Sequence, residues 1–407
     1  MFNSLISLIP YSFQPLFINV LNVLYILSPI YIPFFLGFIA WHLWIGYKRF
    51  GFILKQERIL LELKLPQEIK KTPLAMELFL GSLHQPGGEG TWYDRNFLGK
   101  SRTWFSLEMV SIEGAIKFFV WTEKRFKNLI EAQIYAQYPE VEIYEVPDYT
   151  QFVKLDLNEK SMWGNEFVTT NKVDAFPIKT YVDYGLNREG VKSEEITDPI
   201  TPIIEFLGSV GKGEQVWIQI LVRAHKGGKT GWEGEDWRKI GEKAKEDLLE
   251  KLKSEEGKPL RLATKGEQDI LSAIERNIDK PAFDTGIRGI YITDKDKFNP
   301  INITGLTGTF KQFNSASLNG FRPNRVPGFD FPWQDYKNFR VNKIKKELFG
   351  EYKRRAYFYY PYKSGKQFVL SSEELATIYH LPGGVAQTPT FSRITSKKSE
   401  PPTNLPF

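Results

Sequence analysis

Two short segments come closest to a phosphate-binding loop. Such a loop has the pattern G-x-x-x-x-G-K-[ST], because backbone N–H groups and a helix N-terminus must surround the phosphates. Gly228-Lys229-Thr230 has the right ending, but Arg223 stands at the position of the first glycine. Ser364-Gly365-Lys366 continues into Gln367 in place of serine or threonine. The sequence therefore predicts no ATPase site within these residues.

The histidines, cysteines and carboxylates form no familiar catalytic pattern. His42, His84, His225 and His380 are far apart, and none belongs to an H-E-x-x-H or His-x-His pair. The absence of cysteine excludes disulfides, thiolate nucleophiles and Cys-ligated metals. We therefore predict no cofactor, no metal and no catalytic residue. The alternative left open is an enzyme whose carboxylates, separated in sequence, are brought together by folding.

Aromatic residues with basic neighbours raise the question of single-stranded nucleic acid. Bases stack on exposed aromatic rings of such sheets. Two predicted strands are rich in aromatic residues: Phe118, Phe119 and Trp121 in one, and Tyr357, Phe358, Tyr359 and Tyr360 in the other. Two small basic clusters also occur, Lys353-Arg354-Arg355 and Ser396-Lys397-Lys398. Neither stretch has the RNA-recognition pattern. Packing in the core is the favoured interpretation, with nucleic acid as a partner left open.

Charge is distributed very unevenly along the 407 residues. All the charged side chains, 54 Lys and Arg and 48 Asp and Glu, lie at or after Lys48. The net charge of +6 is therefore carried by the body of the chain alone. A surplus of this size permits contact with anionic partners without requiring it.

The uncharged leader predicts a membrane anchor in residues 1–50. Residues 28–47 form an apolar run long enough for a bilayer core of about 30 Å. Pro29 and Pro33 are expected in its first turns, and residues 13–27 as a separate interfacial helix. Trp41, Trp44 and Tyr47 are placed as an aromatic belt, followed by Lys48 and Arg49. The positive-inside rule then predicts a single membrane pass with the bulk of the chain cytoplasmic. Two spans, or a buried core helix, are the alternatives.

The body predicts an α+β fold that begins with a ferredoxin-like domain at residues 51–150. Strand-like alternation at 59–65, 103–112, 115–122 and 141–146 is interrupted by helical patterns at 73–83 and 124–138. Leu74, Leu78 and Leu83 are expected to form the buried face of the first helix. The order βαββαβ is that of the ferredoxin-like fold.

A second, related α+β domain is expected at residues 151–300. Its predicted strands are 176–184, 215–226 and 287–293, and its helices are 199–207, 235–253 and 265–279. Residues 301–380 form a C-terminal extension, with a helix at 301–313, an aromatic strand at 356–362 and a helix at 373–381 capped by Ser371 and Glu374. Residues 381–407 are a Pro-rich linker or docking tail.

The segment QPGGEG at 85–90, followed by Trp92 and Trp104, is the most unusual local sequence. We interpret it as a long connection between a helix and a hairpin. The alternative is a contact loop for a partner subunit.

Several stretches resemble one family of membrane-anchored proteins from candidate-phyla bacteria (Patescibacteria). They are LLELKLP (60–66), KTPLAMELF (71–79), GGEGTW (87–92), WFSLEMVSIEG (104–114) and KNLIEAQIYAQYPEVEIYEV (127–146). In that family such a region precedes a hexameric motor ATPase of the type IV secretion and conjugation class. The residues that carry this resemblance are Pro73, Ala75, Met76, Glu77, Gly87, Gly88, Trp92, Trp104, Ser106 and Glu108.

The segments LSSEELATIYHLPG (370–383) and PPTNLP (401–406) resemble the lead-in to the nucleotide-binding domain of coupling and HerA-like ATPases. The resemblance implies that Ser371, Glu374, Leu381 and Pro382 belong to a region that docks on the motor. It also implies a homo-oligomer. The family's motor would begin after Phe407, so ATP hydrolysis is not expected here. We predict a non-enzymatic module of such a system, anchored in the inner membrane, with a membrane-tethered single-stranded nucleic-acid-binding protein as the alternative.

Overall fold

A computed structural model describes residues 14–66, 69, 71–171, 173–187, 197–227, 235–252, 264–359 and 366–383. The fold is mixed α+β, as predicted. It divides into two compact units, one drawn from residues 1–55 and 89–101 and the other from residues 56–88 and 102–407. We describe the two units separately.

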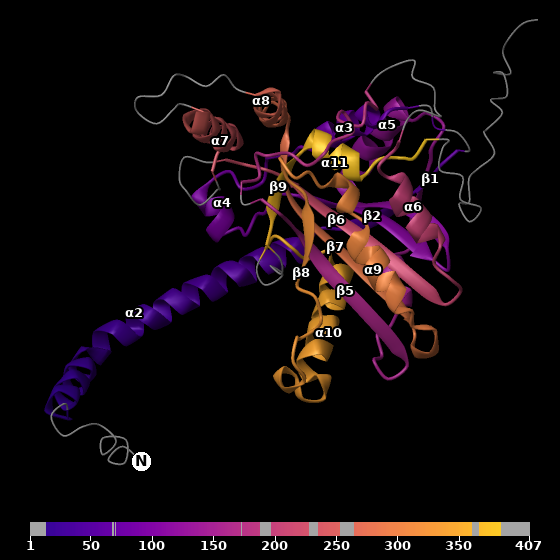
Figure 1. The fold of residues 1–407 in the computed structure, drawn as a ribbon. Helices are drawn as coiled ribbons and strands as arrows, with labels where there is room; N and C mark the ends of the chain where they lie inside the picture. The colour runs from indigo at the N-terminus through magenta and orange to yellow at the C-terminus, as the bar shows by residue number, and fades with distance from the viewer. Residues whose placement is uncertain are drawn as a thin grey trace, which may run out of the picture. The chain divides into compact units, whose positions relative to one another are not determined.

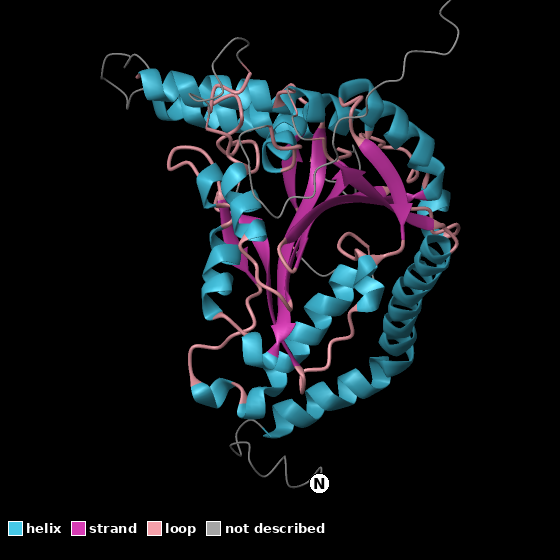
Figure 2. Ribbon diagram, turned by 90° about the vertical axis from the view of Figure 1, so that its right-hand side faces the viewer, coloured by secondary structure: helices cyan, strands magenta, loops and turns pink. Residues whose placement is uncertain are grey.

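The first unit contains helix α2 (Gln14–Leu54) and the short helix α4 (Trp92–Asn96). The helix α2 is continuous, so the interfacial helix expected at 13–27 and the apolar run at 28–47 are parts of one element. Pro29 and Pro33 lie inside α2 and not in its first turns, which corrects the prediction. Each proline removes a backbone hydrogen bond, and the helix bends along its length (Figure 2). The segment around Trp92, expected as a plain connection, contains α4 with a Thr91–Asp94 capping box.

The second unit is built on one antiparallel sheet, in which the described residues form nine strands. They are β1 (Arg58–Lys64), β2 (Trp104–Ile112), β3 (Ala115–Glu123), β4 (Glu142–Val146), β5 (Lys160–Thr169), β6 (Glu214–Ala224), β7 (Ala282–Asp294), β8 (Phe321–Asn324) and β9 (Phe368–Ser371). The strand order is β4-β1-β3-β2-β6-β7-β5-β8, and β9 pairs with the start of β7 (Figure 1).

The two halves of the sheet have the same internal strand order, counted inward from each edge. The first half contributes β4-β1-β3-β2, and the second half contributes β8-β5-β7-β6, which is the same sequence of first, second, third and fourth strands. The second strands of the two halves, β2 and β6, pair antiparallel from Trp104–Arg223 to Ile112–Gln215. The sheet is therefore continuous across the predicted domain boundary at residue 150.

Helices cover both faces of the sheet (Figures 1 and 2). One face packs against α3 (Pro73–Ser82), α5 (Lys127–Gln137), α6 (Thr201–Gly208), α9 (Pro300–Gly308) and α11 (Ser372–Ile378). Alternate strand residues such as Leu107, Phe118 and Ile220 form the apolar core on this face. The other face packs against α10 (Phe339–Arg354). The helices α7 (Trp237–Leu252) and α8 (Lys265–Ile278) lie between β6 and β7 in the chain.

Short 3₁₀ helices complete the described elements. They are η1 (Lys124–Phe126), η2 (Tyr149–Phe152), η4 (Lys295–Lys297), η5 (Lys311–Phe313), η6 (Pro332–Gln334) and η7 (Tyr336–Asn338). The helix expected at 301–313 is thus divided into α9 and η5, whereas α10 had not been predicted at all.

The strand predicted at 176–184 is wrong, because these residues form turns and irregular backbone. Two of their backbone N–H groups bond to side chains of α11 in place of a neighbouring strand. Ile178 N donates to Glu374 (2.9 Å), and Tyr181 N donates to the Thr377 hydroxyl (3.0 Å). The first strand of this half is β5, in a segment where no strand had been expected.

Two further predictions, a strand at 356–362 and the buried face of the helix at 73–83, are also wrong. Residues 356–359 are not a strand, and 360–362 lie outside the described residues. In α3, Leu74 and Leu78 are exposed, while Met76 and Phe79 are buried. The buried face of α3 is therefore rotated from the expected one, although Leu83 beyond its end is buried as predicted.

Candidate functional site

The exposed apolar surface of α2 is the first candidate site. Its residues Tyr25–Leu54 are long and apolar enough to cross a membrane, and no residue of their apolar 18-residue window is buried. The predicted belt residues Trp41, Trp44 and Tyr47 are all exposed, and the Lys48 ammonium lies 4.5 Å from the centre of the Trp44 ring. Such a helix requires a nonaqueous environment, because water would face large apolar side chains on every side.

The face of the sheet beneath α10 carries the second candidate, a row of buried polar side chains. Glu108 on β2 lies opposite Gln219 on β6, which lies opposite Arg288 on β7, which lies opposite Glu166 on β5. All four are 0–1% exposed. Gln219 donates to Glu108 (3.0 Å), and Arg288 contacts Glu166 (3.3 Å). Alternation along four strands thus places a polar row inside an otherwise apolar interior.

Arg355, the residue after α10, closes this row. Its Nε and Nη2 donate to the two oxygens of Glu108 at 3.0 and 3.1 Å, and it also pairs with Asp148. Glu108 further accepts hydrogen bonds from Ser106 (2.7 Å) and Tyr149 (2.8 Å). A buried charge of this kind is tolerated only when it is paired and fully hydrogen-bonded.

The electrostatics of the row follow from burial and pairing. Burial by itself would lower the pKa of Arg355, but Glu108 and Asp148 hold that pKa well above its usual value. Burial raises the pKa of Glu166, against the opposing influence of Arg288 and Arg325. The ion pairs of Arg355 with Glu108 and Asp148 form an ionic clamp at the end of α10, on the face of the sheet that α10 covers.

A second ionic cluster surrounds Asp284 on β7. Its carboxylate accepts hydrogen bonds from Arg223 (3.0 Å to Nε) and contacts His225 Nδ1 (2.6 Å) and Arg102 (3.5 Å). Burial raises its pKa, but His225, Arg223 and Arg102 outweigh this and lower the pKa to about 2. The other nitrogen of His225 lies 3.0 Å from the carbonyl oxygen of Glu235. Because both ring nitrogens are engaged, this Asp–His pair is not arranged to activate a nucleophile.

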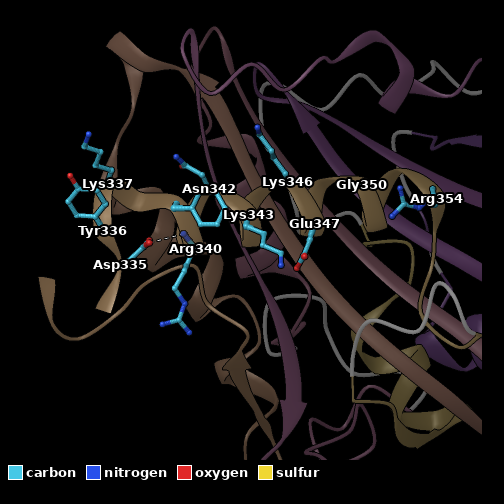
Figure 3. Close-up of a pocket in the computed structure, with 11 residues that line it drawn as sticks. Asp335, Tyr336, Lys337, Arg340, Asn342, Lys343, Lys346, Glu347, Gly350 and Arg354 are labelled. Atoms are coloured by element: carbon cyan, nitrogen blue, oxygen red, sulfur yellow. Dashed lines mark hydrogen bonds between the residues drawn. The ribbon is translucent and has the colours of Figure 1, made fainter. Parts of the chain in front are cut away.

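A groove along α10 is the third candidate site (Figure 3). It has a volume of about 1000 Å³, and its residues extend from Asp335, just before η7, to Arg354 at the end of α10. The opposite side of α10 packs through Phe349 and Tyr352 on Trp217, with ring centres 6.1 and 5.3 Å apart. The clamp at Arg355 therefore fixes the helix whose outer side lines the groove.

The groove is basic with aromatic residues at one end. Five of its lining residues are basic and two are acidic: Lys337, Arg340, Lys343, Lys346 and Arg354, against Asp335 and Glu347. Glu347 contacts Arg325 (3.3 Å), and Asp335 accepts the N–H groups of Arg340 and Val341. Within the described parts of the chain, Lys343 and Lys346 have no ion-pair partner. Both acids are thus engaged while cationic side chains remain available to an anion.

Exposed rings continue beyond the groove. Tyr336 and Phe339, which line it, are 78% and 73% exposed. Trp333 is 78% exposed and stacks on Phe331 with ring centres 4.8 Å apart. This surface was missed from the sequence, although four aromatic residues within nine positions next to a Lys/Arg-rich stretch were a visible signal.

The sequence pattern of the DUF8128 family, described as a domain of unknown function, matches residues 54–393. The chain belongs to this family. The match begins at the last residue of α2 and includes the sheet, the ionic clamp and the groove. No curated protein matches the chain.

Within the DUF8128 region the structure brings three of the family-motif residues together. Trp104, Ser106 and Glu108 alternate along β2 and point to one face, where the Trp104 indole donates to the Arg355 carbonyl (2.9 Å). Glu77 lies apart from them, where it pairs with Lys280 (2.7 Å). The remaining motif residues have separate surroundings: Pro73, Ala75 and Met76 are buried on α3, Gly87 and Gly88 are exposed, and Trp92 belongs to α4.

The residues assigned to tail docking are buried in this DUF8128 fold. The capping box of Ser371 and Glu374 at the start of α11 is confirmed. Both side chains are 0% exposed, and Leu381 and Pro382 are buried as well. These four residues therefore hold α11 in place, and a docking surface would have to lie elsewhere. The tail beyond Gly383 is outside the described residues.

The aromatic residues considered for base stacking are also in the interior. Phe118, Phe119, Trp121 and Tyr357 to Tyr359 are all buried, which confirms the core-packing interpretation for the described ones; Tyr360 is outside the description. In the predicted basic cluster 353–355, the Arg355 side chain is 1% exposed and is used by the clamp. Among the described residues, no group of three His, Asp or Glu side chains is placed to hold a metal ion.

Proposed function

We propose that this chain is a non-enzymatic, membrane-anchored module of a type IV secretion or conjugative DNA-transfer machine. The observation that carries the proposal is α2, a helix of membrane-crossing length that is uncharged before Lys48 and largely exposed, and that precedes a large α+β body. The resemblance to regions that precede motor ATPases supplies the kind of machine. Lys48 and Arg49 after the apolar run favour the inner membrane with a cytoplasmic body.

We further infer that each half of the body is a ferredoxin-like unit and that the two arose by duplication. The repeated strand order, with a helix after the first and third strands of each half, supports this inference. In the second half, α7 and α8 are an insertion between the second and third strands. Such a double unit would serve as a rigid mount for other subunits, including further copies of itself.

A motor ATPase is the proposed partner, held through the tail at 384–407. We expect affinity purification of the detergent-solubilised full chain from its own cells to recover a protein with a G-x-x-x-x-G-K-[ST] loop. Removing residues 384–407 should lower that recovery, while a scrambled tail of equal composition tests whether composition alone suffices. Recovery of no such ATPase, or equal recovery after the deletion, would contradict the proposal.

The groove along α10 favours a second candidate function, the binding of single-stranded nucleic acid. Lysines along α10 provide positive charge for phosphates, and the exposed aromatic rings next to them provide surfaces on which bases can stack. The residues proposed to contact nucleic acid are Tyr336, Phe339, Lys343 and Lys346, because the aromatic residues first considered are buried.

Salt dependence distinguishes this candidate. Lys343→Glu with Lys346→Glu should weaken binding of single-stranded DNA and reduce the slope of log K against log salt by roughly 1.4, since each lost phosphate contact contributes about 0.7. The matched control is Lys239→Glu with Lys243→Glu on the exposed surface of α7, which changes the net charge equally. Equal slopes for the two variants, or no binding at low salt, would exclude the groove as a nucleic-acid site.

A further inference from the structure

The short helix α4 packs directly on the membrane-crossing helix of its own unit. The rings of Trp92 and Phe97 lie 6.1 and 6.0 Å from that of Trp41, and 5.4 Å from each other. These three rings form an aromatic contact between α4 and α2. The contact is made at the level of the belt residues, near the end of the uncharged run.

A glycine brings the two backbones together a few residues later. A Cβ on Gly99 would lie 2.4 Å from the carbonyl carbon of Lys48, and Gly99 has a φ of +66°. Both the space and the backbone conformation therefore require glycine at this position. The chain after α4 thus touches α2 at the first charged residue that follows Tyr47.

Large apolar side chains of α4 and of the residues after it are partly exposed. Trp92, Tyr93 and Leu98 are 58%, 57% and 43% exposed. The carboxylate of Asp94 is bonded to Thr91 (2.8 Å) and to Lys100 (2.9 Å) within the same segment. Exposed rings beside paired charges are typical of an element at the membrane interface, where Trp and Tyr place an apolar ring and a polar tip.

We propose that α4 is an interfacial membrane element that inserts Trp92 and Tyr93 at the boundary of headgroups and acyl chains. This inference rests on the proposed membrane anchoring of α2. The occupant of the surface is lipid, because the surface is continuous with the apolar side of α2 and lies at its Trp41–Lys48 end. By lying at the interface, α4 would fix how deeply α2 inserts. The roughly 20 residues before Lys48 would then lie in a bilayer core of about 30 Å.

The absence of cysteine allows a direct test in the full chain. Trp92→Cys, Tyr93→Cys and Leu36→Cys are each labelled with a nitrobenzoxadiazole fluorophore and reconstituted in phosphatidylcholine–phosphatidylglycerol vesicles. We expect labels at 92 and 93 to be quenched more strongly by lipids with a spin label near the headgroup than by lipids labelled deep in the acyl chain. The label at 36 should show the reverse order.

The same experiment separates the two proposals. Quenching at 36 without quenching at 92 and 93 would overturn the role of α4 and leave the anchor intact, whereas no quenching at any position would overturn both. Disulfide-linked dimers of the unlabelled Trp92→Cys or Tyr93→Cys variant, without lipid quenching, would assign the surface to a second copy instead. Gly99→Val should abolish quenching at 92 while quenching at 36 persists, because a side chain there clashes with the Lys48 backbone.

Discussion

Replacing Arg355 with alanine is expected to lower the free energy of unfolding by about 3–5 kcal/mol, because removing one partner of a buried ion pair leaves the other charge uncompensated. Here two carboxylates lose their partner at once. Glu108 is 0% exposed and pairs with Nε of Arg355, while Asp148 pairs with Nη1 of the same guanidinium. A loss of this size is a large part of the roughly 5–15 kcal/mol that stabilises a typical domain. Denaturant unfolding in detergent, followed by Trp fluorescence, measures it.

Lys346→Ala is the matched control for this prediction. It removes a basic side chain from the same helix, but Lys346 is exposed and lines the groove. Its effect should stay within about 0.5 kcal/mol, as for most surface substitutions. An Arg355→Ala variant as stable as Lys346→Ala would mean that the clamp does not hold α10 on the sheet. The groove would then lack the rigid support that we assign to it.

The strand residues of the clamp could be found in the sequence, but their partner could not. The segment WFSLEM alternates so that Trp104, Ser106 and Glu108 must share one face of a strand. The same alternation does not tell which face is covered by a helix. Arg355 lies 247 positions from Glu108, and no local pattern links the two. A buried acid in a strand was thus the only available sign of a distant cation.

Period-2 alternation is also an incomplete predictor of strands. The segment at 176–184 has an apolar pattern because Ile178 and Tyr181 are buried, yet the N–H groups of these two residues are satisfied by side chains of α11. Conversely, β5 contains Gly164, Asn165 and Glu166 in its middle, and these residues obscured a real strand. Tertiary packing decided both cases, which is why local propensity alone gave the wrong answer.

The strands of the first half could be predicted from the sequence, but the pairing of the two halves could not. The order of elements in the first half followed from patterns within about 90 residues, and all of its strands were located. The joining of β2 to β6 depends on residues more than 100 positions apart, such as Phe105 and Val222. Whether two similar units form separate domains or one sheet is settled by whether their edge strands pair, and that pairing joins residues far apart in the sequence.

Charging the centre of α2 is expected to release the protein from membranes. Phe35→Arg with Ile39→Arg places two guanidinium groups on adjacent turns near the middle of the apolar run, where both native side chains are exposed. Each arginine at the centre of a bilayer helix costs about 2.5–3.5 kcal/mol on the insertion scale, so the pair costs about 5–7 kcal/mol. We expect the native chain to stay in the pellet after carbonate extraction, and the double variant to be recovered in the supernatant or degraded.

The contrast with Leu54→Arg makes this prediction specific to the apolar run. Leu54 is exposed at the end of α2, after Lys48 and Arg49, where an added charge can reach water or headgroups at little cost. This variant should therefore remain in the membrane. Mass spectrometry of this variant should detect the intact N-terminus. An intact N-terminus indicates a permanent anchor, whereas its loss would indicate a cleaved signal sequence. A double-arginine variant that stays in the pellet would show that membrane attachment depends on another part of the chain, and α2 would then need a protein partner to cover its exposed side chains.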